Sequence, residues 1–409
     1  MINFTAWPEM LAWPYLMLNG WLPYRDIAIA HNPLLLFDLV IFFKLFGVGI
    51  MQLKIYTWIL IAFNTWLTFF VTKKFWSQKI GLLTSVLYIL FCIIYQGNGL
   101  WFDLALTPFA LLLYLFVREK KYAYAGLIFA LGFLTKQTFV YFALPVAIAI
   151  VQSTEYKVLR IKQFLLGGFP VAVIFALILS IFGILDDYYN WAIKFGIFYL
   201  PNADGQILLP NLKQFIFAIS PFGVLIFNSE LLIITFALVG ALGVYPRWEL
   251  FHFQPALPFL SIVLASFVYS KRNIFLNSLI IVCSMLYVVY GVGRQLGVNT
   301  RFFEPEVQKV TSEITKHKPL VSNIYVINYW DNVYALTNTF PNSPLIPYIP
   351  WYLDYQGSKQ SILDGLKAKS PELIVIGERD KIFPELYIFV DNYYSCNVVE
   401  KKVELCEKN

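Results

Sequence analysis

Asn19-Gly-Trp-Leu-Pro-Tyr-Arg-Asp26 and the nearby Ala30-His-Asn-Pro-Leu-Leu35 are polar segments in a chain that is otherwise mostly apolar. They follow Glu9 and a stretch rich in Trp, Pro and Tyr, and they precede a long series of apolar runs. Trp and Tyr concentrate at the boundary between membrane and water. The order predicts a short interfacial helix near residues 8–18, then a loop, ahead of the membrane spans.

The composition predicts a polytopic membrane protein. Hydrophobic residues make up 59% of the chain and charged residues 14%, and the mean hydropathy is +0.64. Soluble proteins are about half apolar and about a quarter charged. The net charge of +6 does not indicate a nucleic-acid partner, because most basic residues ahead of the C-terminal tail lie in short loops between apolar runs.

Ten apolar stretches are candidate membrane spans by length and apolarity. They cover roughly residues 53–72, 79–96, 101–117, 122–135, 138–152, 163–184, 212–228, 230–245, 254–270 and 274–293. Several are shorter than the ~20 residues that a straight span needs, so we expect tilted, short or broken helices over 122–152. Residues 34–47 carry Asp38 and Lys44, which favours a second interfacial helix. We therefore divide the chain into a first external loop (1–52), a transmembrane domain (53–293) and an extracytoplasmic domain (294–409).

Basic residues fall in alternate loops, which predicts the orientation of the chain. These residues are Lys73, Lys74, Lys79, Arg118, Lys120, Lys121, Lys157, Arg160, Lys162, Lys271 and Arg272. Cytoplasmic loops are enriched in Lys and Arg. We therefore expect a multi-pass plasma-membrane protein whose first loop and C-terminal domain face outward.

The tail has the pattern of a small α/β domain. Residues 323–327 and 372–376 are expected to be buried strands, with a helix over 358–369 between them. The tail has no Gly-rich phosphate loop. Cys396 and Cys406 flank a predicted turn at residues 400–402, and disulfides form readily outside the cell. We expect these two cysteines to form a bridge.

Ionisable residues near the predicted outer face are candidates for function, because charges at membrane depth are costly. They are Glu9, Arg25, Asp26, His31, Asp103, Lys136, Asp186, Asp187, Lys194, Arg247 and His252. Glycosyl transfer from a lipid phosphate needs a carboxylate to take the acceptor proton and cations to hold the departing phosphate. Glu9 and Asp103 are the carboxylate candidates. Lys136, Arg247 and His252 are the phosphate-binding candidates.

Structural readings compete with these roles. Asp26 could pair with Arg25 or cap a turn, and His31 before Asn-Pro could be a turn residue. Asp186 and Asp187 could end a span, and Lys136 could anchor at the interface. No tight acidic cluster predicts a metal site, although a divalent cation would be held by carboxylates if one took part.

Several motifs, taken in order, resemble the GT-C class of polyprenyl-phosphate-dependent membrane glycosyltransferases, family 39 and the protein mannosyltransferases. They are Glu9, Gly20-Trp-Leu-Pro-Tyr-Arg-Asp26, His31-Asn-Pro-Leu34, Phe43-Lys-Leu-Phe-Gly47, Trp101-Phe-Asp103 with Thr107-Pro108, Gly132-Phe-Leu-Thr-Lys-Gln137 and Phe253-Gln-Pro-Ala-Leu-Pro258. The resemblance spans about residues 8–270. It implies catalytic roles for Glu9 and Asp103. It also implies substrate binding by Tyr24, Arg25, Asp26, His31, Lys136, Gln137, Arg247 and His252.

The implied activity is transfer of a sugar from a polyprenyl-phosphate donor to a lipid, glycan or protein acceptor at the outer face. The chain departs from the family where Pro8 replaces an Asp of an acidic pair and Asn32 replaces a Pro. Family members also begin with a membrane helix ahead of the first loop, which favours a truncated start here over insertion through a later helix. The alternatives are a transporter or flippase of lipid-linked sugars, for which inverted repeats are expected, and a catalytically inactive relative.

Overall fold

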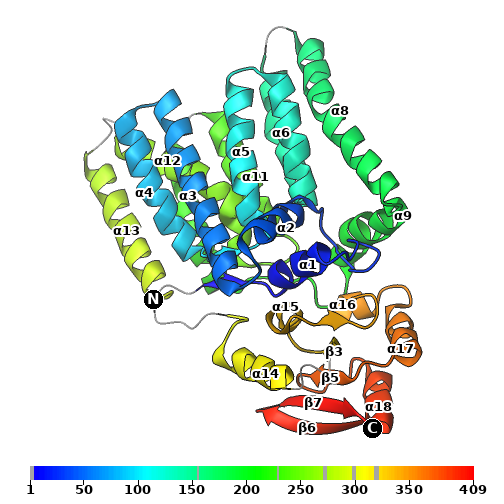
Figure 1. Ribbon diagram of the computed structural model, residues 1–409. Helices are drawn as coiled ribbons and strands as arrows, with labels where there is room; N and C mark the ends of the chain where they lie inside the picture. The colour runs from blue at the N-terminus through cyan, green and yellow to red at the C-terminus, as the bar shows by residue number, and fades with distance from the viewer. Residues whose placement is uncertain (1–3, 154–155, 228–229, 270–273, 297–300, 317–321) are drawn as a thin grey trace.

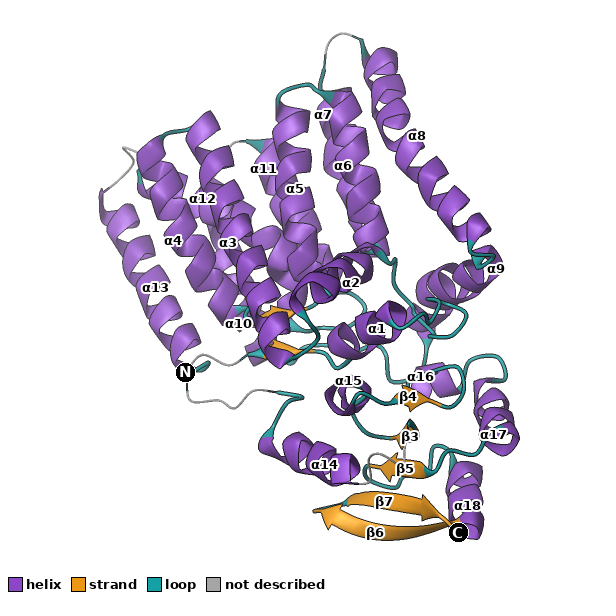
Figure 2. Ribbon diagram, viewed as in Figure 1, coloured by secondary structure: helices purple, strands orange, loops and turns teal. Residues whose placement is uncertain are grey.

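The fold is a helical bundle with a small α/β unit at one end (Figures 1 and 2). The computed structural model describes residues 4–409 except 154–155, 228–229, 270–273, 297–300 and 317–321. Within the described residues, helical segments cover each of the ten predicted spans. They are α3 (Ile50–Phe75), α4 (Gln78–Ile94), α5 (Phe102–Arg118), α6 (Tyr122–Thr135), η1 (Gln137–Phe142) with α7 (Ala143–Val151), α8 (Lys157–Ile181), α10 (Leu212–Ile219) with η4 (Ser220–Phe227), α11 (Leu231–Ala241) with η5 (Leu242–Val244), η6 (Leu250–Ala256) with α12 (Leu257–Val268), and α13 (Ile274–Gly293).

Three of the described helical segments are long and apolar enough to cross a membrane by length and composition, and others are shorter. The three are Ile50–Phe75, Lys157–Ile181 and Leu250–Val268. The apolar window of Leu250–Val268 is 89% buried and that of Lys157–Ile181 is 11% buried. The first of these two is therefore central and the second peripheral. The predicted break within 122–152 is present, because the 3₁₀ segment η1 separates α6 from α7.

The first loop lies across one end of the bundle. Its helices α1 (Glu9–Leu18) and α2 (Leu34–Phe46) run across the ends of the long helices (Figure 1). Strand β1 (Thr5–Ala6) pairs in parallel with β2 (Gly99–Leu100), with Ala6 opposite Leu100. Seven residues of α1 are buried, from Met10 to Leu16. The loop is thus packed against the bundle and is a fixed part of the fold.

The C-terminal unit is a five-stranded mixed sheet with helices around it. The strand order is β4-β3-β5-β7-β6. Strands β3 (Asn323–Ile327) and β5 (Leu373–Ile376) are parallel and almost entirely buried, as predicted, and α17 (Ser358–Ala368) connects toward β5. The remaining elements are α14 (Pro305–Lys316), α15 (Asn332–Thr337), β4 (Phe340–Pro341), α16 (Pro350–Leu353), α18 (Pro384–Tyr393), β6 (Tyr394–Glu400) and β7 (Val403–Lys408).

The predicted bridge between Cys396 and Cys406 is present. The two residues face each other across the β6–β7 hairpin, whose turn lies at Lys401 and Lys402. Cys406 is fully buried in the core of the C-terminal unit. The bridge closes a ten-residue separation, which in the chain-entropy treatment stabilises the fold by about 2–3 kcal/mol.

We predict that alkylation of the denatured protein without reductant will modify Cys92 and Cys283 but neither Cys396 nor Cys406. The two unpaired thiols serve as internal controls, and mass spectrometry of the tryptic peptides reads all four positions. Alkylation of both tail cysteines in protein taken from native membranes would reject the bridge.

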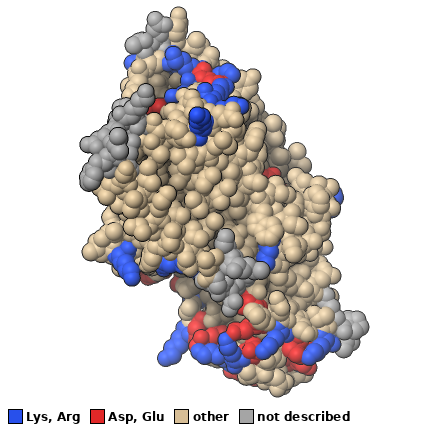
Figure 3. Space-filling model, turned by 90° about the vertical axis from the view of Figure 1, so that its left-hand side faces the viewer, with Lys and Arg blue, Asp and Glu red and all other residues tan. Residues whose placement is uncertain are grey.

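Charged side chains gather at the two ends of the molecule and leave an apolar belt between them (Figure 3). At the end away from the C-terminal unit, Lys74 and Lys121 both pair with Glu119. These pairs place the basic loops before α4 and after α5 at one end, and Figure 1 shows the start of α8 at the same end, as the charge pattern predicted. Lys271 and Arg272 lie outside the described residues.

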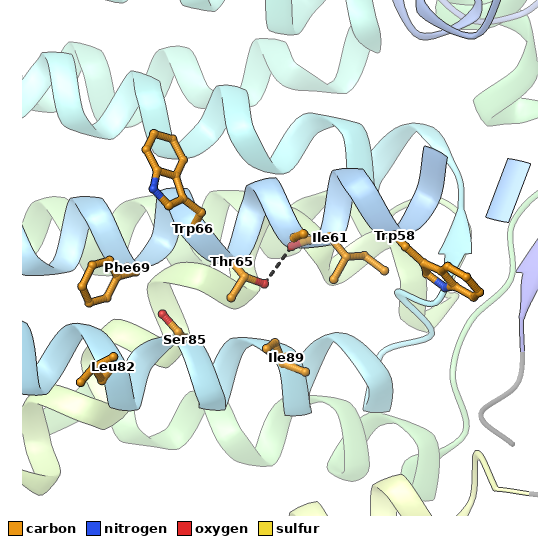
Figure 4. A pocket seen from close by; sticks show the side chains of 9 residues that line it. Trp58, Ile61, Thr65, Trp66, Phe69, Leu82, Ser85 and Ile89 are labelled. Atoms are coloured by element: carbon orange, nitrogen blue, oxygen red, sulfur yellow. Dashed lines mark hydrogen bonds between the residues drawn. The ribbon is translucent and has the colours of Figure 1, made fainter. Parts of the chain in front are cut away.

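The membrane-facing surface also has an apolar groove between α3 and α4 (Figure 4). Trp58, Trp66, Phe69, Leu82 and Ile89 are among its lining residues. Its hydroxyl groups bond to carbonyls of their own helices, Thr65 to Ile61 at 2.8 Å and Ser85 to Gly81 at 3.0 Å. None of its lining residues is charged, so the groove has no group for acid–base chemistry or phosphate binding.

Candidate functional site

Asp103 is the centre of a buried ionic cluster. Its Oδ2 lies 2.6 Å from Nζ of Lys136 and 2.9 Å from Nδ1 of His252. Nζ of Lys136 is in turn 3.4 Å from Nδ1 of His252. Asp103 is 1% exposed, Lys136 4% and His252 8%. Buried charges are retained only where they are paired, and Lys136 satisfies that condition for Asp103.

The three residues of the cluster all lie at or next to the ends of helical segments. Asp103 is in the first turn of α5, directly after strand β2. Lys136 follows the last residue of α6, where the chain turns into the 3₁₀ segment η1. His252 lies in the 3₁₀ segment η6 that precedes α12. Helix ends leave backbone groups and side chains free to turn inward, so the cluster forms where spans begin and end.

One carboxylate oxygen of the cluster accepts no hydrogen bond from the part of the chain that the structure describes. Among the described residues, Oδ1 of Asp103 has no hydrogen-bond partner although it is buried. An unsatisfied buried oxygen is costly. The free Oδ1 therefore marks a point where a substrate group could donate a hydrogen bond.

His31 and Gln137 lie beside this cluster. The His31 ring is 4.6 Å from the ring of Phe102 and 5.6 Å from that of Trp101. Burial and then the positive charge of Lys136 lower the pKa of His31 to about 3. His31 is therefore neutral at physiological pH and acts as a hydrogen-bonding group instead of a cation.

The pairing of β1 with β2 sets the start of α1 beside the start of α5, because Ala6 is opposite Leu100. Glu9 is the first residue of α1, three residues after β1, and Asp103 is in the first turn of α5, three residues after β2. Burial raises the pKa of Glu9 to about 7. Its Oε2 is buried with no hydrogen-bond partner among the described residues. Glu9 acts electrostatically on Asp331, whose pKa is raised to about 8 by burial first and by Glu9 second.

The remaining first-loop candidates have structural partners. The Tyr24 hydroxyl donates to the carbonyl of His31 at 3.0 Å. Arg25 pairs with Asp187 at 3.1 Å on the surface. Oδ2 of Asp26 accepts from the amide of Leu22 at 2.8 Å, which is the turn-capping role considered from the sequence. The structure therefore places Arg25 and Asp26 outside the Asp103 cluster.

Arg247 lies in a separate cavity of 1270 Å³. Four cations are among the lining residues, Lys213, Arg247, Arg294 and Arg301, together with the acid Glu249. Nε of Arg247 is 2.8 Å from Oε1 of Glu249, and its guanidinium group lies over the ring of Trp351. The cavity borders the cluster through Trp7, which also packs against Trp101 and Phe251. An excess of cations in a concave site favours an anionic ligand.

The cluster does not resemble a metal site. Nζ of Lys136 occupies the position beside Oδ2 of Asp103 that a bound metal ion would otherwise take. Among the described residues, Cys396, Glu404 and Cys406 are close enough to hold an ion, but the two cysteines are joined in a disulfide.

Part of the chain is similar in sequence to a known family. Residues 30–181 match the family described as dolichyl-phosphate-mannose-protein mannosyltransferase. The matched stretch contains His31, Asp103, Lys136 and Gln137, whereas Glu9, Arg247 and His252 lie outside it. No curated protein matches the chain in sequence.

Comparison with solved structures extends the fold assignment over the whole chain. ArnT from Cupriavidus metallidurans bound to undecaprenyl phosphate aligns with a TM-score of 0.63 and 12% identity, covering 99% of this chain and 94% of ArnT. Apo ArnT aligns with a TM-score of 0.64 and 13% identity over the same shares of the two chains. The GT-C fold expected from the motifs is therefore confirmed, with a small C-terminal mixed sheet.

Several residues of this region were absent from the sequence predictions. Arg294 and Arg301 follow the last apolar helix, so their position next to the membrane was a usable signal. Asp331 and Tyr352 carry no such signal, because they approach the first loop only through the tertiary fold.

Proposed function

We propose that this protein is an integral membrane glycosyltransferase that moves a sugar from a polyprenyl-phosphate donor to an acceptor at the outer face of the plasma membrane. The observation that supports this most directly is the buried Asp103–Lys136–His252 cluster beside a cation-lined cavity. The family match over residues 30–181 and the fold shared with ArnT agree with it. The C-terminal unit and the first loop would then be extracytoplasmic, in agreement with the basic loops at the opposite end.

The proposed reaction is a single displacement with inversion. The acceptor hydroxyl oxygen attacks the anomeric carbon while the bond from that carbon to the phosphate oxygen breaks. The bonding electron pair leaves with the phosphate, and a carboxylate takes the hydroxyl proton. Glu9 suits the role of base, because a pKa near the working pH balances proton affinity against the deprotonated fraction. Asp103 holds Lys136 and His252 toward the reacting phosphate, and its free Oδ1 can accept a hydrogen bond from the substrate.

Arg247 in the cavity is proposed to bind the donor phosphate. We predict that Arg247→Gln will weaken undecaprenyl-phosphate binding by about 1–3 kcal/mol, the scale of a charge-assisted hydrogen bond. Binding is measured by microscale thermophoresis of the detergent-solubilised protein. Glu249→Gln is the matched control, since it frees Arg247 from its partner and should preserve or tighten binding. Equal affinity of wild type and Arg247→Gln would remove Arg247 from the site.

The function itself is tested by incubating the purified protein with radiolabelled polyprenyl-phosphate sugars and a membrane extract as acceptor source. Transfer of label to a new product, or slow hydrolysis of the donor, supports the proposal. Binding of every donor tested with no transfer and no hydrolysis would contradict it and favour a transporter or an inactive relative.

A further inference from the structure

The backbone of Ala30, His31 and Asn32 is fixed by side chains from several separate elements. Nε2 of Gln137 donates to the carbonyl of Ala30 at 2.9 Å and to that of Ala192 at 3.1 Å. Tyr24 donates to the carbonyl of His31 at 3.0 Å. The segment that carries His31 is therefore held at successive residues.

Asn32 adds a contact with the membrane domain. Its Nδ2 donates to the carbonyl of Phe133 in α6 at 2.5 Å. Its Oδ1 accepts from the hydroxyl of Tyr188 at 2.9 Å, at the end of α9 (Leu185–Tyr188). Asn32 is fully buried, so these bonds are shielded from competing water.

The C-terminal unit holds the same loop from the other side. The amide of Leu345 donates to the carbonyl of Asp26 at 2.7 Å, and the amide of Ala28 donates to the carbonyl of Leu345 at 2.9 Å. Two residues further along, the amide of Ala30 donates to the hydroxyl of Tyr352 in α16 at 3.3 Å. Alternate residues of the loop thus bond to the C-terminal unit in the manner of a strand.

Tyr352 is itself held firmly. Its ring is 4.5 Å from that of Phe195 and 6.0 Å from that of Trp191, both in the π-helical segment η2 (Tyr189–Tyr199). The backbone of Gly196 in η2 lies so close to Ala30 that a Cβ there would be 2.2 Å from the Ala30 carbonyl oxygen. In Figure 1, α16 lies below α1 and below the α9 region. The contact therefore joins the membrane domain, the first loop and the C-terminal unit.

From this network we infer that Tyr352 is a positioning residue of the site, through which the C-terminal unit sets the place of His31 beside the Asp103 cluster. The expected effect of Tyr352 on catalysis rests on the proposed function. Its effect on the position of the first loop rests on the hydrogen bonds alone. Small displacements of a positioned group can lower turnover strongly. The C-terminal unit then helps to hold the catalytic site in place, although the sequence of this unit contains no motif that indicates such a role.

The test compares Tyr352→Phe with Tyr355→Phe. Tyr355 belongs to the same aromatic cluster, and its hydroxyl bonds to Oδ1 of Asn190 at 3.0 Å instead of to the first loop. Both variants lose one hydroxyl and keep the ring. Hydrogen–deuterium exchange of peptides covering residues 27–34 reports the Ala30 amide directly. We expect exchange there to become about fivefold faster in Tyr352→Phe, as for the loss of one ordinary hydrogen bond, and to stay at the wild-type rate in Tyr355→Phe.

Steady-state kinetics of the two variants are the second measurement. Tyr352→Phe should lower kcat about tenfold with little change in KM for the donor, while Tyr355→Phe keeps both. Unchanged exchange in Tyr352→Phe, or equal acceleration in both variants, would overturn the inference even if the enzyme transfers sugar. If the protein proves to have no transfer activity, the exchange comparison still decides the structural claim, so the two failures are distinguishable.

Discussion

Asp103→Asn is expected to abolish detectable sugar transfer and to lower the free energy of unfolding by about 3–5 kcal/mol, the usual cost of removing one partner of a buried ion pair. Lys136 is 4% exposed, and the substitution removes the negative charge beside its ammonium group. The loss of transfer follows because Lys136 and His252 then lose the group that orients them. Thermal unfolding in detergent and the radiolabelled transfer assay measure the two effects.

A double variant separates stability from chemistry. Asp103→Asn with Lys136→Met removes both charges, and replacement of a whole buried pair by apolar groups is often nearly neutral. We expect this variant to recover most of the stability but none of the transfer. Recovery of transfer with stability would mean that the cluster is only a structural ion pair.

Glu9 should give the activity its dependence on pH. Burial raises its pKa to about 7, so the base form accumulates as the pH rises through 7. We expect kcat to rise with pH with a midpoint near 7, and Glu9→Gln to lose that rise together with most of the activity. The stopped assay from pH 5 to pH 9 measures the profile.

The same shift has a consequence for stability with a definite sign. The pKa of Glu9 in the folded protein, about 7, lies above its ordinary value of about 4.5, so the folded protein binds more protons than the unfolded chain between these two values. Stability therefore falls as the pH rises from about 4.5 to about 7. Glu9→Gln removes this penalty and should stabilise the protein at pH 8 by about 3 kcal/mol, with little effect at pH 4.

Asp331→Asn is the matched control for Glu9. Asp331 is buried, its pKa is also raised, and it is influenced by Glu9, but it lies directly before α15 in the C-terminal unit instead of in the first loop. We expect its variant to keep the rise in kcat near pH 7. A rise that survives in Glu9→Gln and disappears in Asp331→Asn would transfer the role of base to Asp331.

The spans, the interfacial helices and the tail strands were predictable because each depends on local patterns. Hydropathy over about 20 residues marks a span, and short continuous apolar runs mark the buried strands β3 and β5. The Cys396–Cys406 bridge was also within reach, because a ten-residue separation around a turn permits few arrangements. Boundaries were less certain: α8 begins at Lys157, six residues before the predicted span, since a helix can continue past the membrane into a basic loop.

Candidate residue types were also evident from the sequence, but their grouping was not. The sequence indicated Asp103, Lys136 and His252 as ionisable residues near one face, and it indicated Arg247 and Arg25 on the same grounds. Only helix packing brings His252 to Asp103, which lies 149 residues away, while it leaves Arg247 with Glu249 and Arg25 with Asp187. The sequence by itself thus determined the membrane class, the order of the spans and the set of charged candidates, because burial in a bilayer acts on each segment separately. Tertiary structure decided which charges meet and that Tyr352 reaches Ala30, because contacts between distant segments depend on how the whole chain packs.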